Sequence, residues 1–198
     1  MTFTPIESHR QSQYQVRFDW GAAGAATIAA GADVVVLVDV LEGGGDETGR
    51  LSLSKPRILG ALVDNPAVVV AGSLRNRMAV AKWALERQGN KGDRFMVAVV
   101  AAGEVRSDGS IRFALEDLLG AGAIIDALAD VGIDYCSPEA AAAAAAFTGL
   151  RNATGHLIGA SASGRERTAS GQRVDVDLAI ELDVSASVDI LREFTPDA

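Results

Sequence analysis

The chain has 198 residues and a net charge of −8, with 48% apolar and 5% aromatic residues. This charge excludes a nucleic-acid surface and a basic membrane-binding surface, because both need clustered Lys and Arg that the sequence lacks. The length suits one sizeable core or two small lobes that share one, so we expect a single α/β domain over residues 1–198. A lone Cys136 excludes an internal disulfide and no signal-peptide pattern opens the chain, which predicts a cytoplasmic protein.

The first part of the chain alternates between strand and helix patterns. Residues 14–20 alternate between apolar and polar side chains, as in a strand, and apolar runs typical of strands cover residues 33–39 and 67–72. Helix patterns cover residues 22–30 and 74–87. Ser73 stands directly before the second of these helices and is its expected N-cap.

Two segments in this part need a choice. Residues 21–41 are apolar enough to resemble a membrane span, but Asp33 and Asp39 interrupt them. A helix followed by a buried strand therefore explains them better. Residues 42–57 contain three consecutive glycines followed by mixed polar residues, which predicts a mobile loop.

The second part continues the alternation. Residues 95–102 form a continuous apolar run, as in a strand covered on both faces. Helices are predicted at 115–129, at 138–146 with Ser137 as N-cap, and at 175–181, with a turn into a helix at 161–166 and a closing edge segment at 187–194. This order predicts a layered α/β/α fold with a central mixed, largely buried sheet and helices on both faces.

Several familiar chemistries are absent from the sequence. His9 and His156 give no histidine pair at metal-ligand spacing, and Cys136 has no Arg six residues later. No Walker A loop or Gly-x-Gly-x-x-Gly turn follows a strand. The Asp175-Val176-Asp177 run lacks the preceding strand that a haloacid dehalogenase nucleophile needs, so we interpret it as a surface feature.

Two candidate sites follow strands in the first part of the chain. Asp39 ends the apolar run at 33–39, where a carboxylate can hold a cation or cap a turn. Ser73, Arg75 and Asn76 form a small turn before a helix, which can cradle an oxyanion or serve as an ordinary N-cap. Both interpretations stay open at each place.

Two more candidates lie in the second part. Glu104 and Arg112 follow the strand at 95–102, and Glu116 and Asp117 begin the next helix. A carboxylate pair there can hold a divalent cation, or it can simply complement the helix dipole. The last candidate is the hydroxyl-rich turn at 161–166, which carries Arg165. Together these groups are what metal-assisted phosphoryl chemistry requires.

Seven blocks of the chain, in order, resemble the 2-phosphosulfolactate phosphatase family. They span most of the sequence and are Val34 to Leu41, Gly72 to Asn76, Ala101 to Glu104, Asp108 to Arg112, Leu115 to Asp117 with Gly120 to Ala123, Ser137 to Ala140, and Ser163 to Glu166. The resemblance implies a magnesium-dependent α/β phosphatase that removes phosphate from 2-phospho-3-sulfolactate, on the route to coenzyme M.

The chain also departs from the family pattern. Glu42-Gly43-Gly44-Gly45-Asp46 stands where the family has Arg or Ser and a Thr-rich helix start. No Asn-Gly-Thr or Asn-Gly-Ser turn precedes the Gly-Ser-Leu-Arg-Asn block, and the chain is short in this region. One alternative is therefore a non-catalytic member that binds small anions or acts as a scaffold. Another is an enzyme for a different phosphorylated hydroxy acid.

The resemblance, joined to the residues above, gives a hypothesis for the site. Mg²⁺ is expected among Asp39, Glu104 and Glu116. Asp117 is expected to be the general acid or base, because a like-charged neighbour raises the pKa of one carboxyl of a pair. The expected substrate-binding residues are Ser73, Arg75, Asn76, Arg112 and Arg165. Small residues at 120–123 and 140–146 predict tight packing surfaces, one of which could serve a homodimer.

Overall fold

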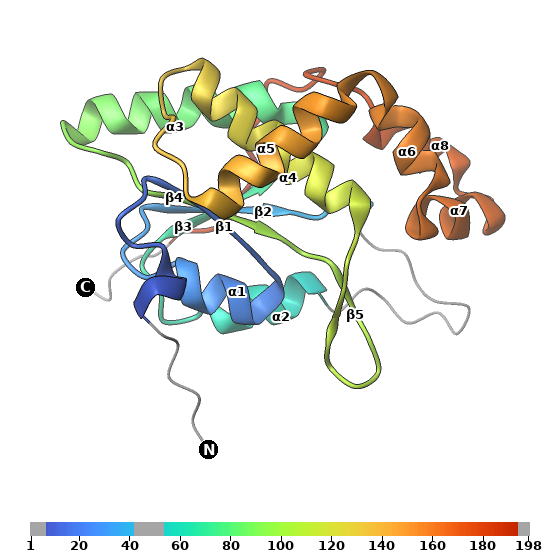
Figure 1. Ribbon diagram of the computed structural model, residues 1–198, viewed down its shortest axis with the longest axis horizontal. Helices are drawn as coiled ribbons and strands as arrows, with labels where there is room; N and C mark the ends of the chain where they lie inside the picture. Colours follow the sequence, from blue (N-terminus) through green and yellow to red (C-terminus); the bar gives the residue numbers. More distant parts are fainter. Residues whose placement is uncertain (1–6, 42–53, 194–198) are drawn as a thin grey trace.

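A central five-stranded sheet organises the molecule (Figure 1). The computed structural model describes residues 7–41 and 54–193. The strands of this sheet are β1 (Val16–Trp20), β2 (Val34–Val38), β3 (Val68–Gly72), β4 (Val97–Ala101) and β7 (Ile190–Arg192). Their order is β1-β4-β2-β3-β7; the first four are parallel and β7 is antiparallel to β3. The mixed sheet and the closing edge segment agree with the sequence prediction.

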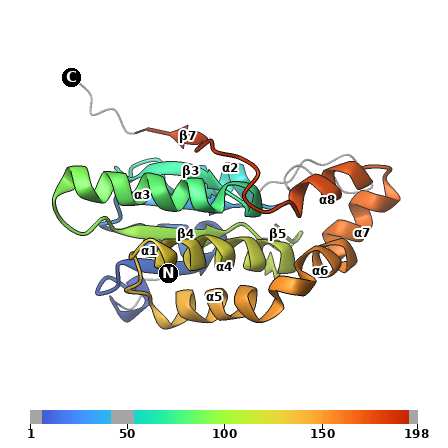
Figure 2. The same cartoon turned by 90° about the horizontal axis from the view of Figure 1, so that it is seen from above.

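Helices cover both faces of the sheet, which confirms the layered α/β/α fold. Figure 1 shows α1 (Gly21–Ile28) and α2 (Ser54–Ala61) on one face. The other face carries α3 (Arg77–Lys91), α4 (Leu115–Asp130) and α5 (Pro138–Leu150). At one end of the molecule lie α6 (Thr154–Ala160), α7 (Ala162–Ala169) and α8 (Arg173–Ala179) (Figure 2). Short pieces complete the described chain: η1 (Glu7–Arg10), η2 (Leu74–Asn76), η3 (Arg151–Ala153), β5 (Glu104–Val105) and β6 (Ile111–Arg112).

The two edges of the sheet differ in what they expose. At the β1 edge, the side-chain amide of Gln11 donates to the Phe18 carbonyl and accepts from the Phe18 N–H, at 2.9 and 3.0 Å. The other edge is β7, where Ile190 is exposed.

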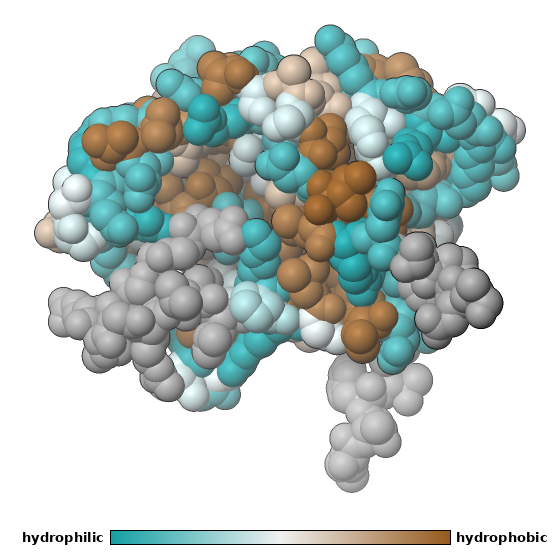
Figure 3. Space-filling model, turned by 180° about the vertical axis from the view of Figure 1, so that it is seen from behind, coloured by the Kyte–Doolittle hydropathy of each residue, from teal (hydrophilic) through white to brown (hydrophobic). Residues whose placement is uncertain are grey.

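Figure 3 shows a band of hydrophobic surface through the middle of the face that lies behind in Figure 1. A homodimer stays a prediction, with this face available for contact.

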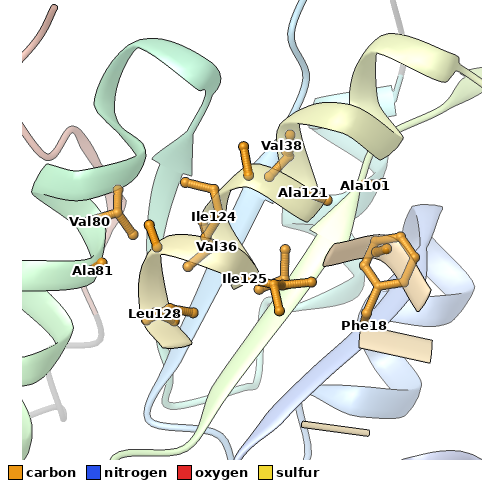
Figure 4. Packing of buried hydrophobic residues seen from close by; sticks show 14 of the residues in the cluster. Phe18, Val36, Val38, Val80, Ala81, Ala101, Ala121, Ile124, Ile125 and Leu128 are labelled. Atoms are coloured by element: carbon orange, nitrogen blue, oxygen red, sulfur yellow. The ribbon is translucent and has the colours of Figure 1, made fainter. Parts of the chain in front are cut away.

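The central strands are buried because both of their faces pack against helices. Val34, Val36 and Val38 face α3, α4 and α5, whereas Val35 and Leu37 face α1 and α2. Figure 4 shows Ile124 and Ile125 of α4 packed near Val36 and Val38. The apolar runs predicted a buried strand at 33–39 and coverage on both faces for the strand at 95–102.

Small residues let α4 lie very close to its neighbours. A Cβ atom on Gly120 would be 2.6 Å from Val40 Cγ2 and 2.9 Å from Val38 Cγ1. A Cβ atom on Gly122 would collide with the Ala143 carbonyl of α5. The close packing that the small residues predicted is thus found within the molecule, and it sets α4 directly over the end of β2.

The sequence predictions were wrong at a few places. Of the predicted loop at 42–57, residues 42–53 lie outside the described part, but Ser54 already begins α2. Pro56 lies in the first turn of this helix, where its missing N–H breaks no helical hydrogen bond. The helix expected at 175–181 begins at Arg173 instead, and η3, α6 and the β5–β6 hairpin had no predicted counterpart.

Other local predictions are confirmed. Ser137 accepts a hydrogen bond from the Ala140 N–H at 3.1 Å, as an N-cap before Pro138 should. The predicted turn into a helix at 161–166 is also found: α7 begins at Ala162, and the Ser161 hydroxyl accepts a hydrogen bond from the Gly164 N–H at 3.1 Å. Within residues 7–41 and 54–193, no helix has the length and apolar character needed to cross a membrane.

Candidate active site at the carboxyl edge of the sheet

The carboxyl ends of the four parallel strands lie side by side at one end of the sheet, which we call its carboxyl edge. Asp39 directly follows β2 and Ser73 directly follows β3. Gly103 and Glu104 come just after β4. Open α/β sheets carry their ligand sites at this edge, so the predicted candidates do gather where chemistry is expected.

Asp117 joins two of these strand ends. It lies in the first turn of α4 and is 3% exposed. Its Oδ1 accepts a hydrogen bond from the Val40 N–H at 2.8 Å, and its Oδ2 accepts one from the Gly103 N–H at 2.9 Å. One carboxylate therefore binds the segments that follow β2 and β4.

Gly103 has the backbone that this contact needs. Its φ is +61°, a conformation that residues with side chains rarely adopt. A Cβ atom here would also lie 2.6 Å from Ile111 Cγ2 in the β5–β6 hairpin. Glycine thus lets the hairpin close over the end of β4.

Three carboxyl groups share this place. Burial raises the pKa of Asp117 well above its ordinary value; the charge of Asp39 raises it further, as does that of Glu116. The two backbone amides act in the opposite direction. Glu116 is 3% exposed, and among the described residues it has no ion pair. Asp39 and Glu116 therefore lie near enough to Asp117 for their charges to act on it.

The acid–base role predicted for Asp117 depends on whether a substrate can reach its oxygens. A carboxyl that exchanges protons with a substrate needs an oxygen that the substrate can reach. Both oxygens of Asp117 accept amide hydrogen bonds and the side chain is buried. This geometry favours a residue that holds the site together.

Glu104 and Arg112 pair with each other. They are opposite residues of the β5–β6 hairpin, and the Arg112 guanidinium forms an ion pair with the Glu104 carboxylate. A metal at Glu104 would have to compete with that ion pair. Glu104 is not among the charged neighbours that raise the pKa of Asp117.

Ser73 and Asn76 form a closed turn. Asn76 Oδ1 accepts from the Ser73 N–H and hydroxyl at 2.9 and 3.1 Å, and its amide nitrogen donates to the Ala71 carbonyl at 3.1 Å. Arg75 forms an ion pair with Glu181 at 3.2 Å. Ser73 thus forms a capping box at the start of the 3-10 turn η2, whereas α3 begins at Arg77 with Asn76 as its N-cap residue. Oxyanion binding by this turn stays a prediction.

The sequence reasoning chose Arg165 and missed Arg167, two residues later on α7. Arg165 is exposed. Arg167 is 7% exposed, and its Nη2 donates to the Leu41 carbonyl at 2.9 Å. Its Nη1 forms an ion pair with Asp175 at 3.1 Å. Arg167 lies three residues after the buried Gly164, on the same helix face, but the sequence alone does not show which face of α7 is buried.

Two cavities have linings from the described residues, and neither lining includes Asp39, Glu116 or Asp117. One of about 320 Å³ is lined by apolar and acidic residues, among them Trp20, Asp19 and Glu139. The pKa of Asp19 is raised, mainly by burial. The other cavity, of about 200 Å³, lies against Ala102, the start of α1 and the β5–β6 hairpin, and includes Ser54 and Arg57. The second is better suited to an anion, because it combines a guanidinium with helix N-termini.

Arg57 was also missed from the sequence. It falls in the segment that was predicted to be a loop, and α2 begins three residues before it. The Ser-Lys-Pro-Arg run, with proline in a first helical turn, was the signal that could have revealed this helix start.

The donors fit a magnesium ion in part. In the part of the chain that the structure describes, no group of three or more His, Cys, Asp or Glu side chains is arranged to hold a metal. Mg²⁺ commonly needs only one or two protein carboxylates, because water and substrate phosphate fill its other positions. Asp39 and Glu116 provide carboxylates of this kind beside Asp117.

Comparison with known proteins gives one positive result. No curated protein sequence matches the chain. The model of a family described as 2-phosphosulpholactate phosphatase matches residues 58–193, which include Glu116, Asp117 and Arg167 but not Asp39. The match covers more than half of the chain and agrees with the fold and the order of the sequence blocks, so the chain belongs to the 2-phosphosulpholactate phosphatase family.

Proposed function

We propose that the protein is a Mg²⁺-dependent phosphatase that hydrolyses the phosphomonoester of a small acidic hydroxy acid, 2-phosphosulfolactate being the first candidate. The observation that carries this proposal is the group of three carboxyls at the carboxyl edge of the sheet, two of which lie in the part matched by the phosphatase family. Membership of that family supports phosphoric monoester hydrolysis at a coarse level.

Asp39 and Glu116 are the proposed ligands of the metal. A bound Mg²⁺ would supply positive charge for a phosphate oxygen and polarise the phosphorus. Asp39 approaches from the end of β2 and Glu116 from the first turn of α4. Because these elements pack directly on each other, the two carboxylates are held on a rigid base.

Positive groups around the edge would bind the anionic parts of the substrate. Arg57 lines the cavity of about 200 Å³, and we propose that it receives the phosphate or the second acidic group. Arg165 is exposed on α7 and is proposed for the same task. Arg75 and Arg112 would first have to leave Glu181 and Glu104.

The test is phosphate release from a panel of phosphorylated hydroxy acids, with and without Mg²⁺. The panel includes 2-phosphosulfolactate and a generic aryl phosphate. We expect turnover that requires the metal and is lost in Glu116→Gln, which keeps the size of the side chain but removes its charge. Asp130→Asn is the matched control, because Asp130 is an exposed acid at the far end of the same helix.

Other outcomes separate the alternatives. Turnover of another ester, with none of 2-phosphosulfolactate, would change the substrate but keep the reaction. No turnover from folded protein across the panel would overturn the phosphatase and favour a protein that binds small anions. Equal turnover by Glu116→Gln and the wild type would remove Glu116 from the site.

A further inference from the structure

Two side chains from distant parts of the chain form hydrogen bonds with the backbone that follows Asp39. The Val40 N–H donates to Asp117 Oδ1 at 2.8 Å. The carbonyl of the next residue, Leu41, accepts from Arg167 Nη2 at 2.9 Å. The acceptor belongs to α4 and the donor to α7, which lie 77 and 126 residues away in the sequence.

The side chains of the same two residues are also fixed. Val40 and Leu41 are 8% and 9% exposed and belong to the core on the α4 side of the sheet. Val40 Cγ2 fills the space that a side chain at Gly120 would need. Backbone and side chains together therefore leave this segment little freedom, and Asp39 is attached to its start.

Asp117 and Arg167 each make a second contact that fixes their own side chains. The other oxygen of Asp117 binds the Gly103 N–H at 2.9 Å, after β4. The Arg167 guanidinium binds Asp175 of α8 at 3.1 Å through Nη1. A planar guanidinium can bind two partners in different directions in a fixed geometry, which the single ammonium group of lysine does not reproduce.

We propose that Asp117 and Arg167 are positioning residues that clamp the Val40–Leu41 peptide and so fix the direction of the Asp39 carboxylate. The metal part of this inference rests on the proposed function, in which Asp39 is a ligand of Mg²⁺. Groups that orient a ligand in this way affect metal binding strongly, and their loss typically weakens affinity by about 10- to 100-fold.

The experiment compares Arg167→Lys and Asp117→Asn with Arg173→Ala as the matched control. Arg173 is an exposed arginine of the neighbouring helix α8, and its ion pair with Asp177 lies on the surface. Circular dichroism and thermal unfolding first establish that each full-length variant is folded. NMR then measures hydrogen exchange at the Val40 and Gly103 amides without metal, and calorimetry measures Mg²⁺ affinity.

Asp117→Asn can accept only one of the two amide hydrogen bonds, because its NH₂ group is a donor. We expect the Val40 or the Gly103 amide to exchange about tenfold faster, as the loss of one hydrogen bond implies. Arg167→Lys should weaken Mg²⁺ affinity by about tenfold or more and lower kcat more than it changes KM for the phosphate ester. Arg173→Ala should leave all of these unchanged.

The outcomes separate this inference from the proposed function. Folded variants with wild-type amide exchange and wild-type Mg²⁺ affinity would overturn the clamp. A wild-type protein that binds no Mg²⁺ would overturn the proposed function, whereas faster exchange in Asp117→Asn would still support the clamp. A loss of thermal stability with unchanged Mg²⁺ affinity would assign both residues to folding alone.

Discussion

An aspartate links the neighbouring strands β2 and β4 at each of their two ends. One aspartate has a basic partner, whereas the other has acidic neighbours. At the amino end, Asp33 accepts the Met96 N–H at 2.7 Å and is paired with the Lys91 ammonium at 2.7 Å. At the carboxyl end, Asp117 accepts the Val40 and Gly103 amides. In the described chain no basic side chain pairs with Asp117, and two further carboxylates lie beside it.

The amino end shows how this fold balances charge when structure is the only requirement. There, Arg17 is buried and donates to the backbone carbonyls of Tyr14, Ile28 and Ala30. Burial lowers the pKa of Arg17. The carboxyl end instead keeps acidic groups together at a cost in stability, and such groups are typical of functional sites. The contrast is the reason to place the chemistry at the carboxyl end.

The largest expected effect on stability comes from removing the tie at the carboxyl end. Asp117→Ala leaves two buried amides without their acceptor, so we expect the free energy of unfolding to fall by about 2–4 kcal/mol. Asp33→Ala leaves one amide at the other end and should lose about 1–2 kcal/mol. Urea unfolding measures both losses, provided that the slope of the free energy of unfolding against urea concentration is the same in the variants and the wild type. A smaller loss for Asp117→Ala than for Asp33→Ala would contradict the comparison.

A methyl group at Gly120 tests whether the segment after β2 is tightly packed. Gly120→Ala would place Cβ 2.6 Å from Val40 Cγ2, and overpacking of this kind costs about 1–3 kcal/mol. Gly89→Ala in α3 meets no atom within 4 Å and should stabilise the protein by about 0.5–1 kcal/mol. Thermal unfolding of the two variants should therefore move in opposite directions. A stabilised Gly120→Ala would show that the segment can relax.

The direction in which stability changes with pH should reflect the raised pKa of Asp117. Because its native pKa is raised, the native state binds more protons than the unfolded state between the ordinary carboxyl pKa of about 3.9 and the raised value. Stability should fall as pH rises through this window and level off above it. Denaturation in EDTA buffers measures the slope. Asp117→Asn should flatten it, and an unchanged slope in that variant would mean that another group is responsible.

The smallest effect is expected from making the amino end resemble the carboxyl end. Lys91→Met removes the cation beside Asp33, but Lys91 is partly exposed. Surface ion pairs of this kind contribute about 0.2–1 kcal/mol, so we expect a loss in that range. Chemical unfolding at low and high salt should show the difference shrinking as salt screens the pair. A loss of several kcal/mol would mean that the charge balance at this end is essential to the fold.

The sheet was predictable because its pattern is local. The run from Val34 to Val38 is short, apolar at every position and mostly β-branched, which favours a buried strand over a helix. The same holds for β4, and parallel strands then fix the edge at which Asp39, Glu116 and Asp117 meet. Ser137 was predictable as a cap and residues 161–166 as a turn into a helix, because both depend on a few adjacent residues.

The partners of the site residues were not predictable, because they depend on contacts between distant parts of the chain. Nothing near Asp117 in the sequence indicates that it binds the Val40 amide. The choice between Arg165 and Arg167 depends on which face of α7 is buried, and that face was unknown without α8. The start of α2 was hidden because a glycine-rich run comes shortly before it.

The most direct test is an NMR titration of the full-length protein with Mg²⁺, following the amide signals at the two ends of the β2–β4 pair. We predict saturable shifts at Val40 and Gly103, none at Met96, and loss of the shifts in Glu116→Gln. Shifts of equal size at Met96, or no saturable change at Val40 and Gly103, would contradict the assignment of the metal site to the carboxyl end.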